Sequence, residues 1–128
     1  MKINLSRPEI DLKEYKSVKK ILNNKWLING PNVRSFENSF KKKFNYKFCA
    51  SVSSCTSGLE LVLKTLNLKK NDEVILSSFN FIAAGIAIKN NNAKPIFIDQ
   101  KKGSFDIDFE DLKKKINSKT KAILLTHF

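Results

Sequence analysis

The sequence predicts an α/β protein with three layers, in which helices cover both faces of a mainly parallel β-sheet. Short apolar runs at residues 48–52, 73–77, 95–99 and 121–126 are typical of buried strands. They follow one another at similar intervals, and each interval contains a helical pattern. Strands that alternate with helices in this way favour right-handed crossovers and parallel pairing.

Three helical patterns separate these strands. The first places apolar residues at helical spacing on one face: Leu59, Val62, Leu63 and Leu66. The second, residues 81–89, is apolar nearly all round, which predicts a buried helix. The third begins at Asp108, a good N-cap, and places Phe109, Leu112 and Ile116 on one side.

Two further helices are expected before the first strand. One covers residues 8–23, with Ser6 and Glu9 at the spacing of a capping box, and directs Val18, Ile21 and Leu22 inward. The other begins near Pro31, which suits a first helical turn, and aligns Phe36, Phe40 and Phe44. No repeat, flexible linker or interior domain boundary is visible, so a single unit is expected.

Composition excludes several classes of protein. The 128 residues are 41% hydrophobic and 28% charged, which favours a packed core over disorder. No apolar run approaches the roughly 18 residues of a membrane span, and the first residues lack a secretory signal. A cytoplasmic protein without membrane contact is therefore expected. The chain ends in an apolar strand with no polar residues after it, which suggests truncation.

The charge is strongly basic, with 24 Lys and Arg against 12 Asp and Glu and a net charge of +12. This balance raises nucleic acid as a possible partner. Arg7 and Arg34 are the only arginines, however, and arginine is the side chain that best reads phosphates and base edges. The lysine runs at 41–43 and 113–115 are expected on the solvated faces of helices, so the sequence disfavours nucleic-acid binding.

Two loops carry candidate binding chemistry, because ligands of parallel α/β sheets lie beyond the carboxyl ends of the strands. Residues 53–58 combine hydroxyl groups with a helix N-terminus, where a phosphate would fit. The alternative is a capping box between Ser57 and Glu60 among ordinary turn residues. Residues 77–81 bring phenylalanines that could stack on a flat cofactor ring or simply join the core. Neither a P-loop nor a dinucleotide-binding fingerprint is present.

Cysteine and histidine give no second site. Cys55 lies at a helix start, where the pKa of a thiol can fall, but His127 is the only histidine and nothing visible orients the pair. Cys49 and Cys55 cannot form a disulfide framework, and no metal-binding cluster is evident.

Taken in order, seven segments resemble the DegT/DnrJ/EryC1/StrS family of sugar aminotransferases, which use pyridoxal phosphate and have the fold of aspartate aminotransferase. The segments are LSRPEI (5–10), WLINGPNVRSFE (26–37), VSSCTSGL (52–59), NDEVI (71–75), SFNFIA (78–83), AKPIFID (93–99) and TKAI (120–123), followed by His127. Each segment is weak alone, but their order and spacing across nearly the whole chain make the resemblance strong.

The resemblance implies cofactor-binding roles for four residues. Thr56, with the backbone around Cys55 and Ser57, would hold the cofactor phosphate, and Phe81 would stack on the pyridine ring. Cys55 departs from the family's usual Gly or Ala, which is tolerable where only its backbone amide is used. His127 matches a family histidine that precedes a glycine-containing loop.

The resemblance also implies which parts of the enzyme lie elsewhere. The lysine that forms the Schiff base and the aspartate that pairs with the pyridinium nitrogen are expected beyond residue 128, so no catalytic residue is assigned. Residues 1–128 would then be the N-terminal portion of the large domain, inactive alone. The intact homodimer would transfer an amino group, from glutamate, to a nucleotide-linked keto-sugar for cell-surface polysaccharide or related sugar biosynthesis. The alternatives are a dehydratase of the same family and a small basic nucleic-acid-binding module without catalysis.

Overall fold

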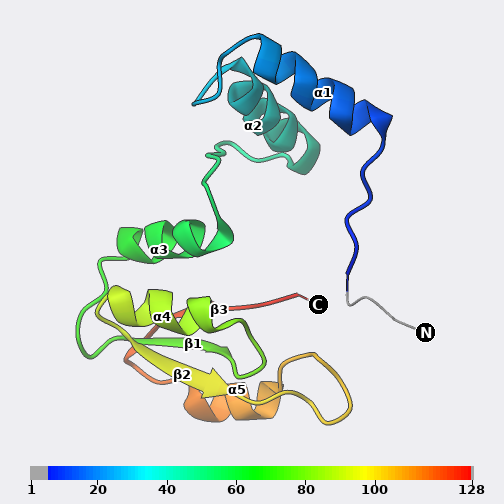
Figure 1. The fold of residues 1–128 in the computed structure, drawn as a ribbon. Coiled ribbons are helices and arrows are strands. Elements are labelled where there is room, and N and C mark those ends of the chain that lie inside the picture. The colour runs from blue at the N-terminus through cyan, green and yellow to red at the C-terminus, as the bar shows by residue number, and fades with distance from the viewer. Residues whose placement is uncertain (1–5, 128) are drawn as a thin grey trace. The chain divides into compact units, whose positions relative to one another are not determined.

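The computed structural model describes residues 6–127, which divide into two compact units that meet at Ser51 and Val52. The first unit contains helices α1 (Leu12–Asn23) and α2 (Pro31–Phe44). The second contains α3 (Cys55–Thr65), β1 (Glu73–Ser77), α4 (Ile82–Asn90), β2 (Lys94–Ile98), α5 (Phe109–Lys115) and β3 (Thr120–Leu124). The order of helices and strands is that of an α/β protein, as predicted (Figure 1). The boundary lies where no boundary was visible in the sequence.

Helix α1 starts later than predicted. Asp11 is its N-cap and accepts a hydrogen bond from the Lys13 N–H at 2.6 Å, while Glu14 Oε2 accepts from the Asp11 N–H at 3.0 Å. The predicted capping box of Ser6 and Glu9 is therefore wrong. Both pairs have the required spacing, so spacing alone could not distinguish them.

The predicted inward face of α1 is also wrong, because Val18 and Leu22 are each 55% exposed. Helix α2 begins at Pro31 as predicted, after the N-cap Gly30. The ring centroids of Phe36 and Phe40 lie 6.0 Å apart and those of Phe40 and Phe44 lie 4.5 Å apart, so the aromatic residues do line one face of the helix. That face is exposed.

The strand predicted at residues 48–52 does not form. In this extended segment the Ser51 N–H donates to Glu37 Oε1 at 2.7 Å instead of to a neighbouring strand. An apolar run becomes a strand only where another strand supplies hydrogen-bonding partners, and no pairing to residues 48–52 occurs within the described part of the chain.

The three remaining strands form a parallel sheet in the order β2-β1-β3. Its central strand, β1, is buried from Val74 to Ser77. Ile75 is aligned with Ile96 on one side and with Ile123 on the other. An apolar central strand covered on both faces is the arrangement expected of a parallel sheet.

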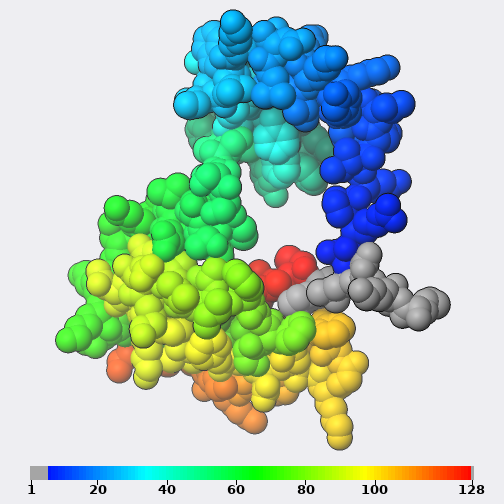
Figure 2. All heavy atoms as spheres, viewed as in Figure 1, coloured from blue at the N-terminus to red at the C-terminus, as the bar shows by residue number. Residues whose placement is uncertain are grey.

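Helices cover the two faces of this sheet, as the sequence predicts (Figure 1). On one face α3 and α4 cover Val74 and Leu76, and Leu63 and Ile88 belong to the same buried cluster. On the other face Leu112 of α5 packs against Ile75 and Ile98. The atoms of α3 and α4 form one continuous surface in the space-filling view (Figure 2).

Fewer residues of these helices are buried than their sequence patterns predicted. Leu63 is buried in α3, whereas Val62 is 63% exposed, and in α5 only Leu112 of the predicted face is buried. The alanines of α4 are buried, while Ile82 is 68% exposed. No helix in residues 6–127 has both the length and the apolar character needed to cross a membrane.

Candidate functional site

The two loops with predicted binding chemistry, residues 53–58 and 77–81, lie at the C-terminal ends of the parallel strands. Strand β1 ends at Ser77 and leads into α4, and α3 runs in the same direction as α4 (Figure 1). Both helices therefore begin on the side of the sheet where the C-terminal ends of the parallel strands lie. In parallel α/β sheets this side is where ligands bind.

The first turn of α3 presents a cluster of hydroxyl groups. Ser54 is the N-cap, and its Oγ accepts from the Ser57 N–H at 3.1 Å and lies 2.9 Å from Ser57 Oγ. Ser53 Oγ lies 3.3 Å from the same Ser57 hydroxyl. The alternative capping box of Ser57 and Glu60 is therefore wrong, since Glu60 Oε1 instead accepts from the side chain of Asn90 at 2.9 Å.

Two backbone donors at this helix start have no protein acceptor within residues 6–127, the N–H groups of Cys55 and Thr56. Both residues are exposed, and Ser57 is half-buried. No carboxylate lies in the first turn of α3 or α4, whereas α1 carries Glu14 and α5 carries Glu110 and Asp111 there. The start of α3 therefore combines free donors with the positive end of the helix dipole and lacks a competing negative charge.

The loop between β1 and α4 holds the fourth predicted residue. Phe81 is the N-cap of α4 and is 76% exposed, so its ring is not part of the core. The Phe81 N–H donates to Asn80 Oδ1 at 2.7 Å. Asn80 Nδ2 is buried and has no hydrogen-bond partner among the described residues. Asn80 was not among the residues predicted from the sequence, where its only signal is its place between two phenylalanines.

The structure thus brings Cys55, Thr56 and Ser57 together on one helical turn. It places Phe81 on a different helix at the same edge of the sheet. Cys55 is an exposed free thiol, and Cys49 is a half-buried one.

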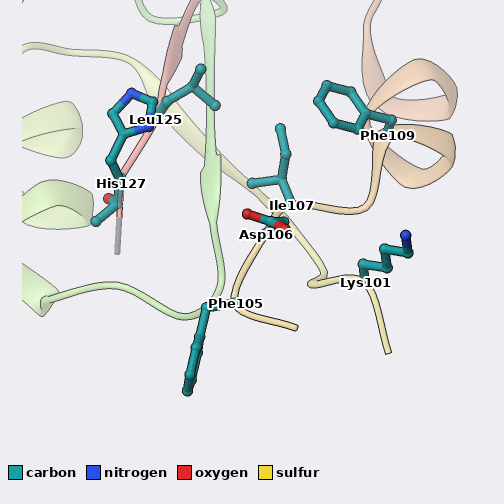
Figure 3. A pocket seen from close by; sticks show the side chains of 8 residues that line it. Lys101, Phe105, Asp106, Ile107, Phe109, Leu125 and His127 are labelled. Carbon is teal, nitrogen blue, oxygen red and sulfur yellow. The ribbon is translucent and has the colours of Figure 1, made fainter. Parts of the chain in front are cut away.

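A separate hollow of about 320 Å³ lies beside β3 and the segment between β2 and α5 (Figure 3). Its lining residues are Lys101, Phe105, Asp106, Ile107, Phe109, Leu125, Thr126 and His127. None of the four predicted cofactor-binding residues is among them. His127 therefore lines this hollow and not the start of α3 or α4. Within residues 6–127, no group of three His, Cys, Asp or Glu side chains could hold a metal ion.

Comparison with known proteins decides the family. The model of the DegT/DnrJ/EryC1/StrS aminotransferase family matches residues 8–128. The chain belongs to this family. The resemblance found in the seven segments is confirmed. The α/β fold class is also confirmed, because parallel strands alternate with helices and solved structures superimpose on the chain with TM-scores of 0.88.

Two curated relatives of the DegT/DnrJ/EryC1/StrS family illustrate the match. The uncharacterized protein MJ1066 of Methanocaldococcus jannaschii is 38% identical over 95% of this chain and 32% of its own length. The GDP-perosamine synthase of Escherichia coli O157:H7 is 33% identical over 98% of this chain and 35% of its own. The chain thus spans about a third of the length of the curated relatives it matches.

Solved structures of the family give the same picture. Spr1654 from Streptococcus pneumoniae, named as a "putative sugar aminotransferase", superimposes in its PLP-form with a TM-score of 0.88 at 28% identity, covering 96% of this chain and 31% of that one. The E. coli GDP-4-keto-6-deoxy-D-mannose-3-dehydratase with bound hydrated PLP gives 0.85 at 29% identity, over 93% and 32%. The cofactor of this family is pyridoxal phosphate, as the sequence predicted.

Proposed function

We propose that residues 1–128 form the N-terminal portion of the cofactor-binding large domain of a pyridoxal-phosphate-dependent aminotransferase acting on a nucleotide-linked keto-sugar. The observation that carries this proposal is the family match over residues 8–128. A relative at 33% identity is named GDP-perosamine synthase, and another at 32% is named a dTDP-sugar transaminase. Because the chain spans about a third of such proteins, the activity is proposed for the complete gene product.

The start of α3 fits the phosphate of the cofactor. The free N–H groups of Cys55 and Thr56 and the hydroxyls of Thr56 and Ser57 supply donors, and the helix dipole favours an anion there. The absence of carboxylates from the first turn of α3 removes a repulsive charge. Cys55 takes part through its backbone, so its thiol is compatible with this role.

Phe81 fits the ring of the cofactor. A phenylalanine that is 76% exposed at a helix start loses apolar contact with water when a flat ring stacks on it. We propose that Phe81 sets the plane of the ring while the turn of Thr56 fixes the phosphate. Together the two helix starts would orient the cofactor at the sheet edge.

When bound, pyridoxal phosphate supplies the electron sink and carries the amino group from the donor, which we propose to be glutamate, to the keto-sugar. The residues of this chain bind and orient the cofactor, and none is proposed as the reacting lysine. That lysine, and the aspartate facing the ring nitrogen, are proposed to follow in the complete protein. The complete protein is proposed to act as a homodimer.

The phosphate assignment is tested with Thr56→Ala in the complete protein. The hydroxyl donates a hydrogen bond to a charged group, worth about 1.5–3 kcal/mol, so its loss is expected to weaken cofactor binding by roughly 10- to 100-fold. Binding is measured by titrating the apoprotein with pyridoxal phosphate. Ser118→Ala, which removes an exposed hydroxyl from a turn outside the site, is the matched control. Equal affinity of the two variants would contradict the assignment.

The ring assignment is tested with Phe81→Leu, which keeps an apolar side chain but removes the aromatic face. A stacked aromatic pair contributes about 0.5–1.5 kcal/mol beyond burial, so a loss of roughly 2- to 10-fold in affinity is expected. Phe48→Leu, at a ring that is 80% exposed in the first unit, is the control.

A dehydratase is a second candidate, favoured by the likeness to the E. coli GDP-4-keto-6-deoxy-D-mannose-3-dehydratase. Incubating the complete protein with glutamate and a nucleotide-linked 4-keto-6-deoxy-sugar separates the two. An aminotransferase adds nitrogen to the sugar, and a dehydratase removes oxygen from it, which mass spectrometry of the product distinguishes. A product without nitrogen would overturn the aminotransferase proposal.

A further inference from the structure

The buried hydroxyl of Ser77, at the start of the loop that carries Phe81, uses its full capacity for hydrogen bonds. Ser77 is 2% exposed, and its Oγ accepts from the Phe79 N–H at 3.2 Å. The same oxygen accepts from Gln100 Nε2. The hydroxyl proton is then directed to the Phe79 carbonyl oxygen, 3.2 Å away. One buried hydroxyl therefore fixes both polar backbone groups of Phe79.

Gln100 decides the direction of these bonds. A hydroxyl has one proton to donate and two lone pairs to accept with. Because the Gln100 amide and the Phe79 N–H fill both acceptor positions, the proton has no other use than the bond to the Phe79 carbonyl. An acceptor in place of the Gln100 amide would attract this proton and release that carbonyl.

The segment from β2 to α5 holds Gln100 in place. Gln100 forms an isolated antiparallel bridge with Ile107, and the Lys101 N–H donates to the Asp106 carbonyl at 2.9 Å. The same segment makes a second contact with the loop, because the rings of Phe79 and Phe105 stack with centroids 5.2 Å apart. Residues 100–107 thus hold residues 77–80 in place through a hydrogen bond and a pair of stacked rings.

We propose that Gln100 is a positioning residue, which acts through Ser77 and Phe79 to fix the orientation of the Phe81 ring toward the cofactor. The inference rests on the proposed function, because it concerns the residue proposed to stack on the cofactor. It adds a residue that does not touch the cofactor and that lies 19 positions after Phe81 in the sequence.

The test compares Gln100→Glu and Gln100→Leu in the complete protein. Both replacements are close in size to glutamine, but the carboxylate can only accept and the leucine can do neither. Each is expected to weaken binding of pyridoxal phosphate to the apoprotein, by no more than Phe81→Leu does. Each is also expected to change the visible circular dichroism band of the bound cofactor, which reports the orientation of its ring. Gln100→Asn, which keeps the amide donor, is expected to retain more of both signals than Gln100→Leu.

A double-mutant cycle with Phe81→Leu separates positioning from general stability. If Gln100 acts through the ring, Gln100→Leu is expected to lower affinity in the native background and to leave it unchanged in the Phe81→Leu background. Equal losses in both backgrounds would overturn the inference and leave the stacking proposal intact. Unchanged affinity in Phe81→Leu itself would overturn the stacking proposal and this inference with it, whereas the Thr56→Ala result would still test the phosphate site.

Discussion

The two units of the chain follow the same local rules but bury very different amounts of apolar surface. Helix α1 has a capping box, helix α2 begins with Pro31 after its N-cap Gly30, and both are amphipathic. All the buried apolar side chains of residues 6–127 nevertheless lie in the second unit. In the second unit the strand β1 supplies Val74, Ile75 and Leu76 as a surface that helices on both faces can cover. An apolar stripe is enough to form a helix, but a core requires a second layer to pack against it.

The comparison predicts that the largest loss of stability comes from the central strand. Ile75→Ala removes a fully buried side chain, which costs about 2–5 kcal/mol. Ile28→Ala in the first unit removes one that is 84% exposed, and its cost is expected to stay within about 0.5 kcal/mol. Chemical denaturation followed by far-ultraviolet circular dichroism measures both. Similar midpoints for the two variants would remove the distinction between the units.

A substitution at Gly30 is expected to have the next largest effect, and it acts on the first unit. A Cβ at this position would lie 2.8 Å from Trp26 Cδ1, closer than real contacts allow. The indole is held by its own hydrogen bond to the Ile28 carbonyl at 2.9 Å, so Gly30→Ala is expected to cost about 1–3 kcal/mol.

Trp26 is the only tryptophan in residues 1–128, so in this 128-residue chain its fluorescence reports the first unit alone. Gly30→Ala is expected to shift the fluorescence transition to lower denaturant concentration, and Ser39→Ala on the exposed surface of α2 is not. A shift of the same size in both variants would contradict the packing argument at Gly30.

The cap of α5 offers a smaller test in the second unit. Asp108 Oδ1 accepts from the Glu110 N–H at 2.8 Å and from the Asp111 N–H at 3.2 Å. Asp108→Ala is expected to cost about 1 kcal/mol, and Asp108→Ser, which can still cap the helix, less than that. The denaturation midpoint measured by circular dichroism should fall, while the midpoint measured by Trp26 fluorescence should not change. A matching fall in fluorescence would mean that the two units unfold together.

The smallest expected effect is a pH dependence at Asp111. Its hydrogen bond from Lys115, at 2.8 Å, and one from the Asp99 N–H lower the pKa of this carboxyl below its ordinary value of 3.8. Its stabilising contribution is therefore present above pH 3.8 and is lost as the pH falls through the lower pKa of the folded state. Asp111→Asn should weaken the dependence of the denaturation midpoint on pH in the acid range, and Ser118→Ala, which removes no titratable group, should leave it unchanged.

Some features of the candidate site could be predicted from the sequence because they depend on neighbours along the chain. The hydroxyl-rich start of α3 and the phenylalanine at the start of α4 follow from short motifs next to helical patterns. The family resemblance then gave those motifs their roles. The contact between Ser77 and Gln100 could not be found in this way, because it joins residues 23 positions apart and depends on the pairing of β1 with β2.

Lys115 shows the same limit outside the site. The sequence places it in a run of solvated lysines, but its Nζ donates to the Phe97 carbonyl at 2.8 Å and pairs with Asp111. It therefore ties α5 to β2. A periodic pattern can assign a charge to the polar face of a helix, but the partner of that charge lies on another element.

The sequence by itself determined the helices from Pro31 onward and the strands β1, β2 and β3, because caps and periodicity act over a few neighbouring residues. The resemblance of its segments to a known family then indicated the family and, through the family, the cofactor. The tertiary structure decided the rest. Residues 48–52 stayed out of the sheet because strand pairing needs a neighbour, and Val18 and Leu22 stayed exposed because no layer covers them among the described residues. Hydrogen-bond ladders and buried surfaces join residues far apart in the chain, and a local pattern contains no information about which partners meet.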